Sequence, residues 1–255
     1  MCGILYIVST PIGNPEDISL RALQVLRTVA LIAAEDVHVS RKLLSHYAIE
    51  TEIISYRPRR KSVSVERERT PEERAGQTAI ASSAEREAES IGPIRAVLTA
   101  GQSVALVCDA GTPTLADPGV RLVNAALAWG AQVTPVPGPS AALAALVVSG
   151  LPAGRFAFDG FPPRARADRQ AFFAALPGET RTLILYETRR YLRSTLQALV
   201  AVLGPERRIV IARNLTLPGE TLFRGALAEA LNALLPDPPR GEYVLILAGR
   251  THPVP

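Results

Sequence analysis

The sequence has few residues of the kinds that build disulfide frameworks, metal sites or membrane spans. Its 255 residues include two cysteines, Cys2 and Cys108, and three histidines. Two cysteines are too few for a disulfide framework, and neither residue type shows the spacing of metal ligands. No apolar run approaches the roughly 20 residues of a membrane span, and residues 4–8 are too short for a signal peptide. We therefore expect a soluble cytoplasmic protein that binds no metal and no membrane.

Three widespread catalytic motifs are also missing. The chain has no G-x-x-x-x-G-K-[ST], no G-x-G-x-x-G after its first apolar run, and no G-x-S-x-G. These absences disfavour a P-loop nucleotidase, an ordinary dinucleotide dehydrogenase and an α/β-hydrolase. The formal net charge of +4 suits an acidic partner such as RNA, but many soluble enzymes have the same charge.

Residues 4–55 alternate between strand and helix patterns. Short apolar runs predict strands at residues 4–9, 30–34 and 52–55. Helical spacing separates them, first after Asp17, which we expect to be an N-cap, and again over residues 40–47. This alternation predicts an α/β domain with a mostly parallel sheet and helices on both faces.

A stiff connector follows the strand expected at residues 131–136. Residues 135–139 contain three prolines, which we interpret as the boundary between domains 1–137 and 138–255. We expect Ser140 to cap a helix over residues 141–149 that Gly150 closes. The connections that follow favour a mixed α/β domain. Its expected strands are residues 156–161, 182–186, 208–212, 220–224 and 243–247, and its later helices are residues 192–203 and 227–235.

A charged insertion, residues 57–92, interrupts the first domain. Arginine and glutamate dominate it, and large apolar residues are almost absent. The composition is typical of a mobile, solvated segment, although residues 57–61 are basic enough for a phosphate-binding arm. Helical order is expected from about Glu85 to Thr99, interrupted or started afresh at Gly92-Pro93.

The centre of the protein is expected at residues 104–119. The apolar run 104–108 predicts a strand buried on both faces, and it ends at a loop rich in Gly, Pro and Thr. Asp117 is expected to cap the next helix, with Pro118 at its first position. Open α/β sheets bind their ligands in such loops, at the carboxyl ends of inner strands.

Three Pro/Gly loops have similar chemistry: Thr10-Pro-Ile-Gly13, Asp109-Ala-Gly-Thr-Pro113 and Pro137-Gly-Pro-Ser140. Glycine allows a ligand to approach the backbone, and proline stiffens the loop so that its polar groups are oriented in advance. Together with Asp109 and Asp117, they suit a neutral or cationic ligand better than a phosphate. S-adenosylmethionine, a sulfonium cation, fits this description. The alternative is that these loops are only tight strand-to-helix turns.

Several motifs in register resemble one known family. They include Leu5-Tyr-Ile-Val-Ser-Thr-Pro-Ile-Gly-Asn14, Ala34-Glu-Asp36, Val107-Cys-Asp-Ala-Gly-Thr-Pro113 and Pro137-Gly-Pro-Ser-Ala141. Gly160-Phe-Pro-Pro-Arg164, Leu185-Tyr-Glu187 and Ala212-Arg213 follow in the same order. Together they are similar to the RsmI family, the 16S ribosomal RNA (cytidine-2′-O)-methyltransferases of the tetrapyrrole methylase superfamily.

The resemblance implies a tetrapyrrole-methylase-like fold of two α/β domains, with S-adenosylmethionine in the cleft between them, that works as a homodimer. It implies 16S rRNA in the small ribosomal subunit as the substrate. The cofactor-binding residues that it implies are Pro11, Asp109, Ala110, Gly111, Thr112, Pro113, Ala116, Ser140, Ala141, Tyr186, Ala212, Asn214 and Leu215.

Two further roles follow from the chemistry of RNA methylation. A ribose hydroxyl needs a base to remove its proton, and Asp36 or Glu35 is our hypothesis for that base. The alternative for Asp36 is that it caps a helix over residues 37–47. Basic side chains could bind RNA phosphates or could simply be solvated surface charges. The candidates are Arg41, Lys42, Arg164, Arg166 and Arg169.

The sequence departs from the family pattern at Val37-His38-Val39, at Asn214 and at Thr188-Arg189-Arg190. Two alternatives therefore stay open. One is a methyltransferase of the same fold that acts on a small tetrapyrrole precursor. The other is a binding protein of ribosome assembly that keeps the fold without the chemistry.

Overall fold

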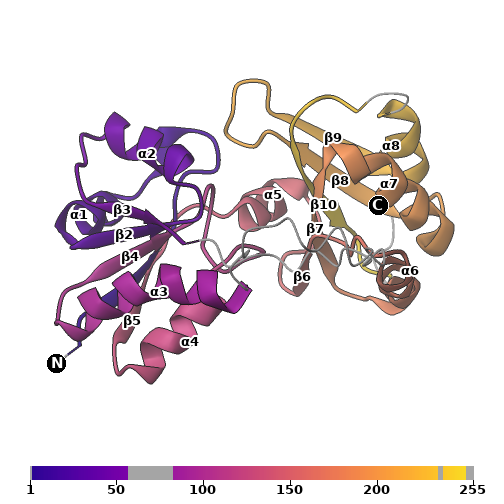
Figure 1. The fold of residues 1–255 in the computed structure, drawn as a ribbon. Helices are drawn as coiled ribbons and strands as arrows, with labels where there is room; N and C mark the ends of the chain where they lie inside the picture. Colours follow the sequence, from indigo (N-terminus) through magenta and orange to yellow (C-terminus); the bar gives the residue numbers. More distant parts are fainter. Residues whose placement is uncertain (1, 57–82, 235–237, 251–255) are drawn as a thin grey trace, which may run out of the picture. The chain divides into compact units, whose positions relative to one another are not determined.

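The computed structural model describes residues 2–56, 83–234 and 238–250 (Figure 1). The chain divides into two compact units, one of residues 1–10 and 17–138, the other of residues 11–16 and 139–255. The short segment 11–16 therefore packs with the second unit. Of the charged insertion expected at 57–92, residues 57–82 lie outside the described part.

The first unit is built on a five-stranded sheet. Its strands are β1 (Ile4–Val8), β2 (Leu31–Ala34), β3 (Ile53–Ser55), β4 (Val104–Val107) and β5 (Gln132–Val136). They lie in the order β3-β2-β4-β1-β5, and every neighbouring pair is parallel. All four residues of β4 are buried, as expected for a strand covered on both faces.

Helices cover both faces of this sheet, as expected. In Figure 1, α1 (Leu20–Thr28) and α2 (Val37–His46) lie above it, and α3 (Ser83–Thr99) and α4 (Val120–Ala128) lie below it. Leu26 and Leu44 bring α1 and α2 into one apolar cluster with Ile32 and Val107. A separate cluster contains residues of α3, α4 and the opposite side of the strands: Leu5, Ala33, Ile94, Leu98, Leu106 and Leu122.

Two expected helix caps in this unit are wrong. Asp17 ends a short 3-10 helix, η1 (Pro15–Asp17), and the Ser19 hydroxyl caps α1 by accepting the Ala22 N–H. Helix α4 begins after Gly119, so neither Asp117 nor Pro118 has the expected cap position. The N-cap of each helix is the residue at which the backbone becomes helical, and the spacing of apolar residues does not locate it to within two positions.

The expected break at Gly92-Pro93 is also wrong, because α3 continues through Pro93. A proline inside a helix removes one backbone donor and costs about 3 kcal/mol. Ile94 and Leu98, on the turns that follow, are fully buried. Their burial, worth about 1.5–3 kcal/mol for each side chain, offsets the cost of the proline.

The second unit contains a mixed sheet, as expected. Its strands are β6 (Phe156–Gly160), β7 (Thr182–Thr188), β8 (Arg208–Arg213), β9 (Thr221–Ala226) and β10 (Glu242–Leu247), in the order β6-β7-β10-β8-β9. Only β6 and β7 are parallel, and β9 is the expected edge strand.

Helix α5 (Ala141–Ser149) covers one face of this sheet, through a cluster that includes Ala145, Leu146, Ile184 and Ile246. The other face carries α6 (Arg166–Ala175), the short 3-10 helix η3 (Leu176–Gly178), α7 (Arg189–Leu203) and α8 (Leu227–Ala233). Helix α7 begins three residues before the expected Leu192. Within the described residues, no helix combines the length and apolar character that crossing a membrane requires.

Candidate active site

The first unit has a topological switch point between β1 and β4. The chain leaves β1 toward β2 on one side of the sheet and leaves β4 toward β5 on the other. Parallel sheets bind ligands beyond the carboxyl ends of their strands at such a point. The expected position of residues 109–119, at the carboxyl end of an inner strand, is therefore confirmed.

Hydrogen bonds join the loops that follow β1 and β4. The Thr10 N–H donates to the Gly111 carbonyl at 2.8 Å, and the Gly111 N–H donates to the Thr10 carbonyl at 3.1 Å. The Ser9 and Thr112 hydroxyls lie 3.0 Å apart, and the Thr10 hydroxyl donates to the Cys108 carbonyl at 3.2 Å. These bonds hold the backbone of the β4 loop in one conformation.

The same loop contains unusual backbone conformations. Gly111 and Gly119 have φ values of +88° and +144°, and Thr114 and Ala116 have φ values of +76° and +64°. For a residue with a Cβ, the left-handed backbone conformation costs roughly 1–2 kcal/mol of conformational energy. Such strain persists only where the surrounding structure imposes it, and it is concentrated at functional sites. Asp109 and Ala110 are exposed at the start of this loop.

Negative charge surrounds the base of the β4 loop. The Cys108 thiol is buried and donates to the carbonyls of Ala110 and Gly111 at 3.5 and 3.4 Å. Burial raises the pKa of Cys108, and the carboxylates of Asp117 and Glu35 raise it further. Nearby carboxylates disfavour a phosphate and favour a neutral or cationic ligand. No group of three or more His, Cys, Asp or Glu side chains in the described ranges could hold a metal ion.

The two candidate bases follow β2, which is the neighbour of β4 in the sheet. Asp36 is the N-cap of α2, and its carboxylate accepts the His38 N–H at 2.8 Å. This confirms the capping alternative for Asp36. The Glu35 N–H donates to the Val107 carbonyl at 3.3 Å, which places Glu35 beside the β4 loop.

In the second unit, α5 and β7 meet at a hydrogen bond between candidate residues. The Tyr186 hydroxyl accepts the Ala142 N–H at 3.1 Å. Ser140 occupies the N-cap of α5, but its side chain makes no capping bond. The expected N-cap position of Ser140 is therefore confirmed, but the hydrogen bond to the first turn of α5 comes from Tyr186 on another element. Phe158 and Phe161 pack edge-on against the Tyr186 ring, with centroids 4.9 and 5.5 Å away.

An apolar cluster brings most candidates of the second unit together. Residues of α5, β7 and β8 form it, and segment 11–16 contributes a side chain through Ile12. Pro11, directly before Ile12, is half-buried. The candidates in this cluster are Ala141, Tyr186, Ala212 and Leu215.

Arg213 holds the loop that follows β8, residues 214–220. Its guanidinium donates at 3.1 Å to the Thr221 hydroxyl, the Gly219 carbonyl and the Arg240 carbonyl. Arg213 lies inside the run Ala212 to Leu215 that the family resemblance marks as part of the cofactor site, but its hold on this loop was not expected. Its position in the sequence points to this role, because Arg213 ends a strand and directly precedes the candidates Asn214 and Leu215.

The β8 loop also has internal restraints. Asn214 and Thr216 have left-handed backbones, with φ values of +53° and +65°. The Glu220 carboxylate accepts the Thr216 N–H at 2.7 Å, and the Thr216 hydroxyl accepts the Asn14 N–H at 3.0 Å. Asn214 and Leu215 are thus presented by a rigid loop.

The basic candidates differ in what they contact. Arg164 donates to the buried Glu187 carboxylate at 3.0 Å and lies over the Tyr191 ring, 4.0 Å from its centroid. Arg169 donates to the Thr195 hydroxyl at 2.7 Å, and burial lowers its pKa. Both guanidiniums therefore bind side chains of the second unit. The sequence did not reveal this hydrogen-bond network. Arg41 and Lys42 on α2 and Arg166 on α6 are exposed, as is Arg164, while Arg169 is half-buried.

Comparisons with known proteins agree on one family. A family model described as tetrapyrrole (corrin/porphyrin) methylases matches residues 4–231. The ribosomal RNA small subunit methyltransferase I of Synechocystis sp. is 41% identical over 249 residues, which cover 98% of this chain and 80% of the relative. The protein of the same name from Pseudomonas aeruginosa is 41% identical, with 97% and 79% covered. That from Bacillus subtilis is 37% identical, with 97% and 75% covered.

Solved structures share the fold at lower sequence identity. A uroporphyrin-III-C-methyltransferase from Thermus thermophilus matches with a TM-score of 0.61 and 21% identity, covering 96% of this chain and 94% of that one. The methyltransferase CobJ matches with a TM-score of 0.67 and 16% identity, covering 99% and 97%. These matches confirm the expected fold class.

The family model spans most of the chain, and the curated relatives match it over at least three quarters of their own length. The resemblance drawn from the motifs is confirmed. The chain therefore belongs to the tetrapyrrole methylase family and, within it, to the ribosomal RNA small subunit methyltransferases I.

Proposed function

We propose that this protein transfers a methyl group from S-adenosylmethionine to the ribose 2′-hydroxyl of a cytidine in 16S ribosomal RNA. The observation that carries the proposal is the 41% identity, over 98% of the chain, to a relative named for methylation of small-subunit ribosomal RNA. The sequence identity to the uroporphyrin-III-C-methyltransferase structure is 21%, and that match concerns the fold alone.

The side chains and backbone groups of the candidate site fit a sulfonium cofactor. In the first unit, Asp117 and Glu35 lie near Cys108, so the β4 loop favours positive charge. In the second unit, Tyr186 and the apolar cluster of α5 and β8 offer a surface suited to an adenine ring. We propose that the residues implied by the resemblance contact the cofactor in these two regions. When bound, S-adenosylmethionine supplies a methyl group attached to a positively charged sulfur. The sulfur is a good leaving group because it departs as a neutral thioether.

The protein's own contribution to the reaction is orientation and removal of a proton. In-line displacement depends on holding the reacting groups in register, and the hydrogen-bonded loops after β1, β4 and β8 are rigid enough for that task. We propose Glu35 as the base that takes the proton of the ribose hydroxyl. Asp36, the other candidate, already binds the N-terminus of α2.

We also propose a homodimer that acts in the cytoplasm. Helix α5 supports the dimer, because Leu143 and Val147, one turn apart, are 50% and 74% exposed. Apolar side chains on one helix face are stabilised when a second surface covers them. A single species of monomer mass in light scattering at micromolar concentration would contradict the dimer.

The proposed activity is tested with tritium-labelled S-adenosylmethionine and 30S ribosomal subunits that lack the modification. We expect label in 16S rRNA, in one cytidine after nuclease digestion. Uroporphyrinogen III in place of 30S subunits is the control for a tetrapyrrole substrate. Label in the tetrapyrrole and not in the RNA would contradict the proposal, as would cofactor binding without any transfer.

A further inference from the structure

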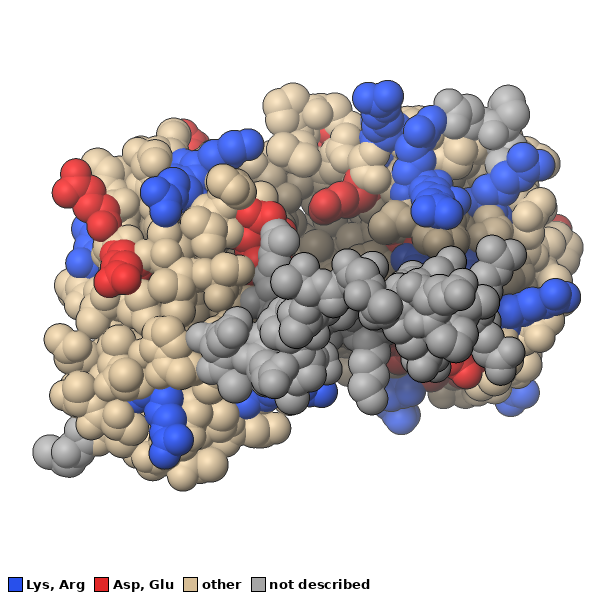
Figure 2. Space-filling model, in the orientation of Figure 1, with Lys and Arg blue, Asp and Glu red and all other residues tan. Residues whose placement is uncertain are grey.

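The arginines of this chain are unevenly distributed. Residues 139–255 contain 14 arginines, no lysine and 9 acidic residues, whereas residues 1–138 contain 14 basic and 15 acidic residues. Arginine side chains, drawn blue, are numerous over the second unit on the face shown in Figure 2. Six arginines lie on or beside the first turns of α6 and α7, and we call them the α6–α7 arginine cluster: Arg164, Arg166, Arg169, Arg189, Arg190 and Arg193.

Two members of the cluster bind a buried carboxylate network. Glu187, at the end of β7, is 1% exposed and accepts Arg164 and the Thr195 hydroxyl. Thr195 in turn accepts Arg169, so the network connects the start of α6 with α7. Arg164 and Arg169 are therefore fixed in position by the second unit itself.

Arg166, Arg190 and Arg193 have exposed side chains. Arg190 and Arg193 are three residues apart on α7 and therefore lie on the same side of the helix. The ring of Tyr191, which lies between them in the sequence, contacts two guanidinium groups. That of Arg164 lies 4.0 Å from the ring centroid, and that of Arg190 lies 5.4 Å from the same centroid. The cluster thus combines exposed guanidiniums with an aromatic ring that fixes two of the six.

The charge of α7 is unfavourable for the helix that carries it. The N-terminal end of a helix favours negative side chains, yet the first five residues of α7 include Arg189, Arg190 and Arg193, with no acidic residue in the first turn. Like charges three residues apart also repel each other. A sequence selected for stability alone would place Asp or Glu here. Binding of an anionic partner gives a reason for arginines at these positions.

We propose that Arg166, Arg190 and Arg193 bind backbone phosphates of the RNA substrate, and that Arg164 and Arg169 are positioning residues for this surface. Guanidinium groups bind phosphates through paired hydrogen bonds, as they also bind carboxylates. The proposed substrate, ribosomal RNA, makes phosphate the anion to expect at this surface. The inference rests on the proposed function.

The test is the double variant Arg190→Glu/Arg193→Glu, with binding to 30S subunits and to 16S rRNA measured at several salt concentrations. We expect Kd to rise about ten-fold and the slope of log K against log salt to decrease by about 0.7 for each lost phosphate contact. KM for 30S subunits should rise while kcat changes little. The melting temperature should not fall, because glutamate is favoured at the start of a helix.

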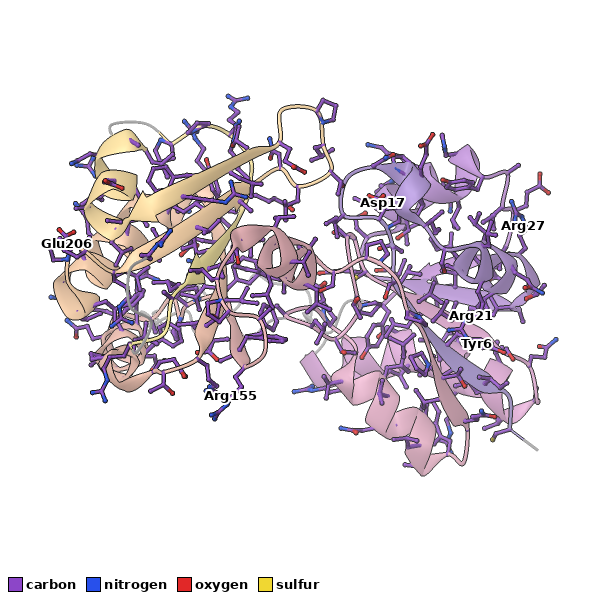
Figure 3. All side chains as sticks on the ribbon, turned by 180° about the vertical axis from the view of Figure 1, so that it is seen from behind. Tyr6, Asp17, Arg21, Arg27, Arg155 and Glu206 are labelled. Carbon is purple, nitrogen blue, oxygen red and sulfur yellow. The ribbon has the colours of Figure 1, made fainter. Side chains whose placement is uncertain are left out.

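The matched control is Arg155→Glu/Arg250→Glu, which changes the net charge equally. Both arginines are exposed, and Arg155 projects away from the second unit (Figure 3). The Arg155 carbonyl accepts the Thr182 N–H, and the Arg250 N–H donates to the Glu179 carbonyl, so both lie at the opposite end of β7 from the cluster. We expect the control to bind RNA like the wild type or nearly so.

Equal weakening by the two double variants would overturn the inference, because net charge alone would then explain it. Unchanged binding by the cluster variant, or no RNA binding by the wild type, would also overturn it. The inference would also be overturned if the cluster variant bound 30S subunits more weakly but bound 16S rRNA like the wild type. That result would assign the surface to a ribosomal protein. If the wild type binds RNA at this cluster but methylates no 30S subunits, the proposed function fails and the inference stands.

Discussion

Glu35 and Asp36 are adjacent acidic residues for which the fold provides different surroundings. Asp36 accepts a backbone N–H of α2, while Glu35 lies beside Cys108 at the carboxyl end of β4. The Asp36 carboxylate therefore has a structural role at the start of α2. The structure thus shows one role for Asp36, the helix cap that the sequence left as an alternative.

We predict that Glu35→Gln lowers kcat by about 10²–10⁴, the usual contribution of a general base, with cofactor affinity unchanged. Asp36→Asn should retain most of the activity, since asparagine is as good an N-cap as aspartate. Single-turnover methylation of 30S subunits checks both variants. Full turnover by Glu35→Gln would exclude it as the base, and a large loss in Asp36→Asn would move the role to Asp36.

Cys108 predicts a dependence of stability on pH. Its pKa is raised in the folded protein, so above pH ~9 the unfolded chain loses a proton that the folded chain keeps. The free energy of unfolding should therefore fall above that pH, by up to about 1.4 kcal/mol per pH unit, with no effect of this group below pH ~8. Urea unfolding at pH 8, 9 and 10 measures the slope.

Cys108→Ser should remove this alkaline slope, because a serine hydroxyl does not ionise in that range. Cys2→Ser is the matched control, since Cys2 is half-buried and lies at the start of the chain. An identical alkaline slope in the wild type and in Cys108→Ser would show that another group is responsible.

At the scale of elements, the β4 loop depends on the glycine that begins α4. Gly119 has φ +144°, and a Cβ there would lie 2.8 Å from side-chain carbons of Leu106 and Thr114. We predict that Gly119→Ala lowers the free energy of unfolding by about 1–3 kcal/mol and weakens cofactor binding. Gly130→Ala is the control. Its φ is +78°, and no atom lies within 4 Å of an added Cβ, so only the backbone cost of about 1 kcal/mol applies. Equal losses in urea unfolding would contradict the steric argument.

The first turn of α5 is capped by the Tyr186 hydroxyl of another element. We therefore expect Tyr186→Phe and Ser140→Ala to differ in their effect on stability. Tyr186→Phe removes the acceptor of the Ala142 N–H and should cost about 1 kcal/mol of stability. Ser140→Ala should cost less, because the Ser140 side chain makes no capping bond. Thermal unfolding and titration of S-adenosylmethionine check both. A larger loss of stability in Ser140→Ala would restore the cap expected from the sequence.

In the whole molecule, the succession of strands and helices along the chain could be predicted because short apolar runs end at turn residues. The order of the strands within each sheet was not predicted. The caps at Asp17 and Asp117 could not be predicted, since the local backbone decides whether Ser19 or Gly119 takes that position. The continuation of α3 through Pro93 depends on burial of Ile94, which a local pattern does not contain.

Some features of the candidate site could likewise be predicted from the sequence, and others could not. The loops around Gly111 and Asn214 are visible as Pro/Gly-rich or family motifs in the sequence. The groups that hold them are not, because Thr10 and Gly111 are 101 residues apart and Arg213 and Arg240 are 27 residues apart. Contacts between residues so distant along the chain follow from the packing of whole elements.

The central claim is methylation of one ribose 2′-hydroxyl in 16S rRNA. A methyl group there removes the nucleophile that alkali needs to break the neighbouring phosphodiester bond. We propose to treat unmodified 30S subunits with the wild-type protein and S-adenosylmethionine, hydrolyse the rRNA in alkali, and identify resistant dinucleotides by mass spectrometry. We expect one new resistant dinucleotide that contains cytidine, and we expect it to be absent when Glu35→Gln replaces the wild type under single-turnover conditions. Complete hydrolysis, or a methyl group on a base, would contradict the central claim.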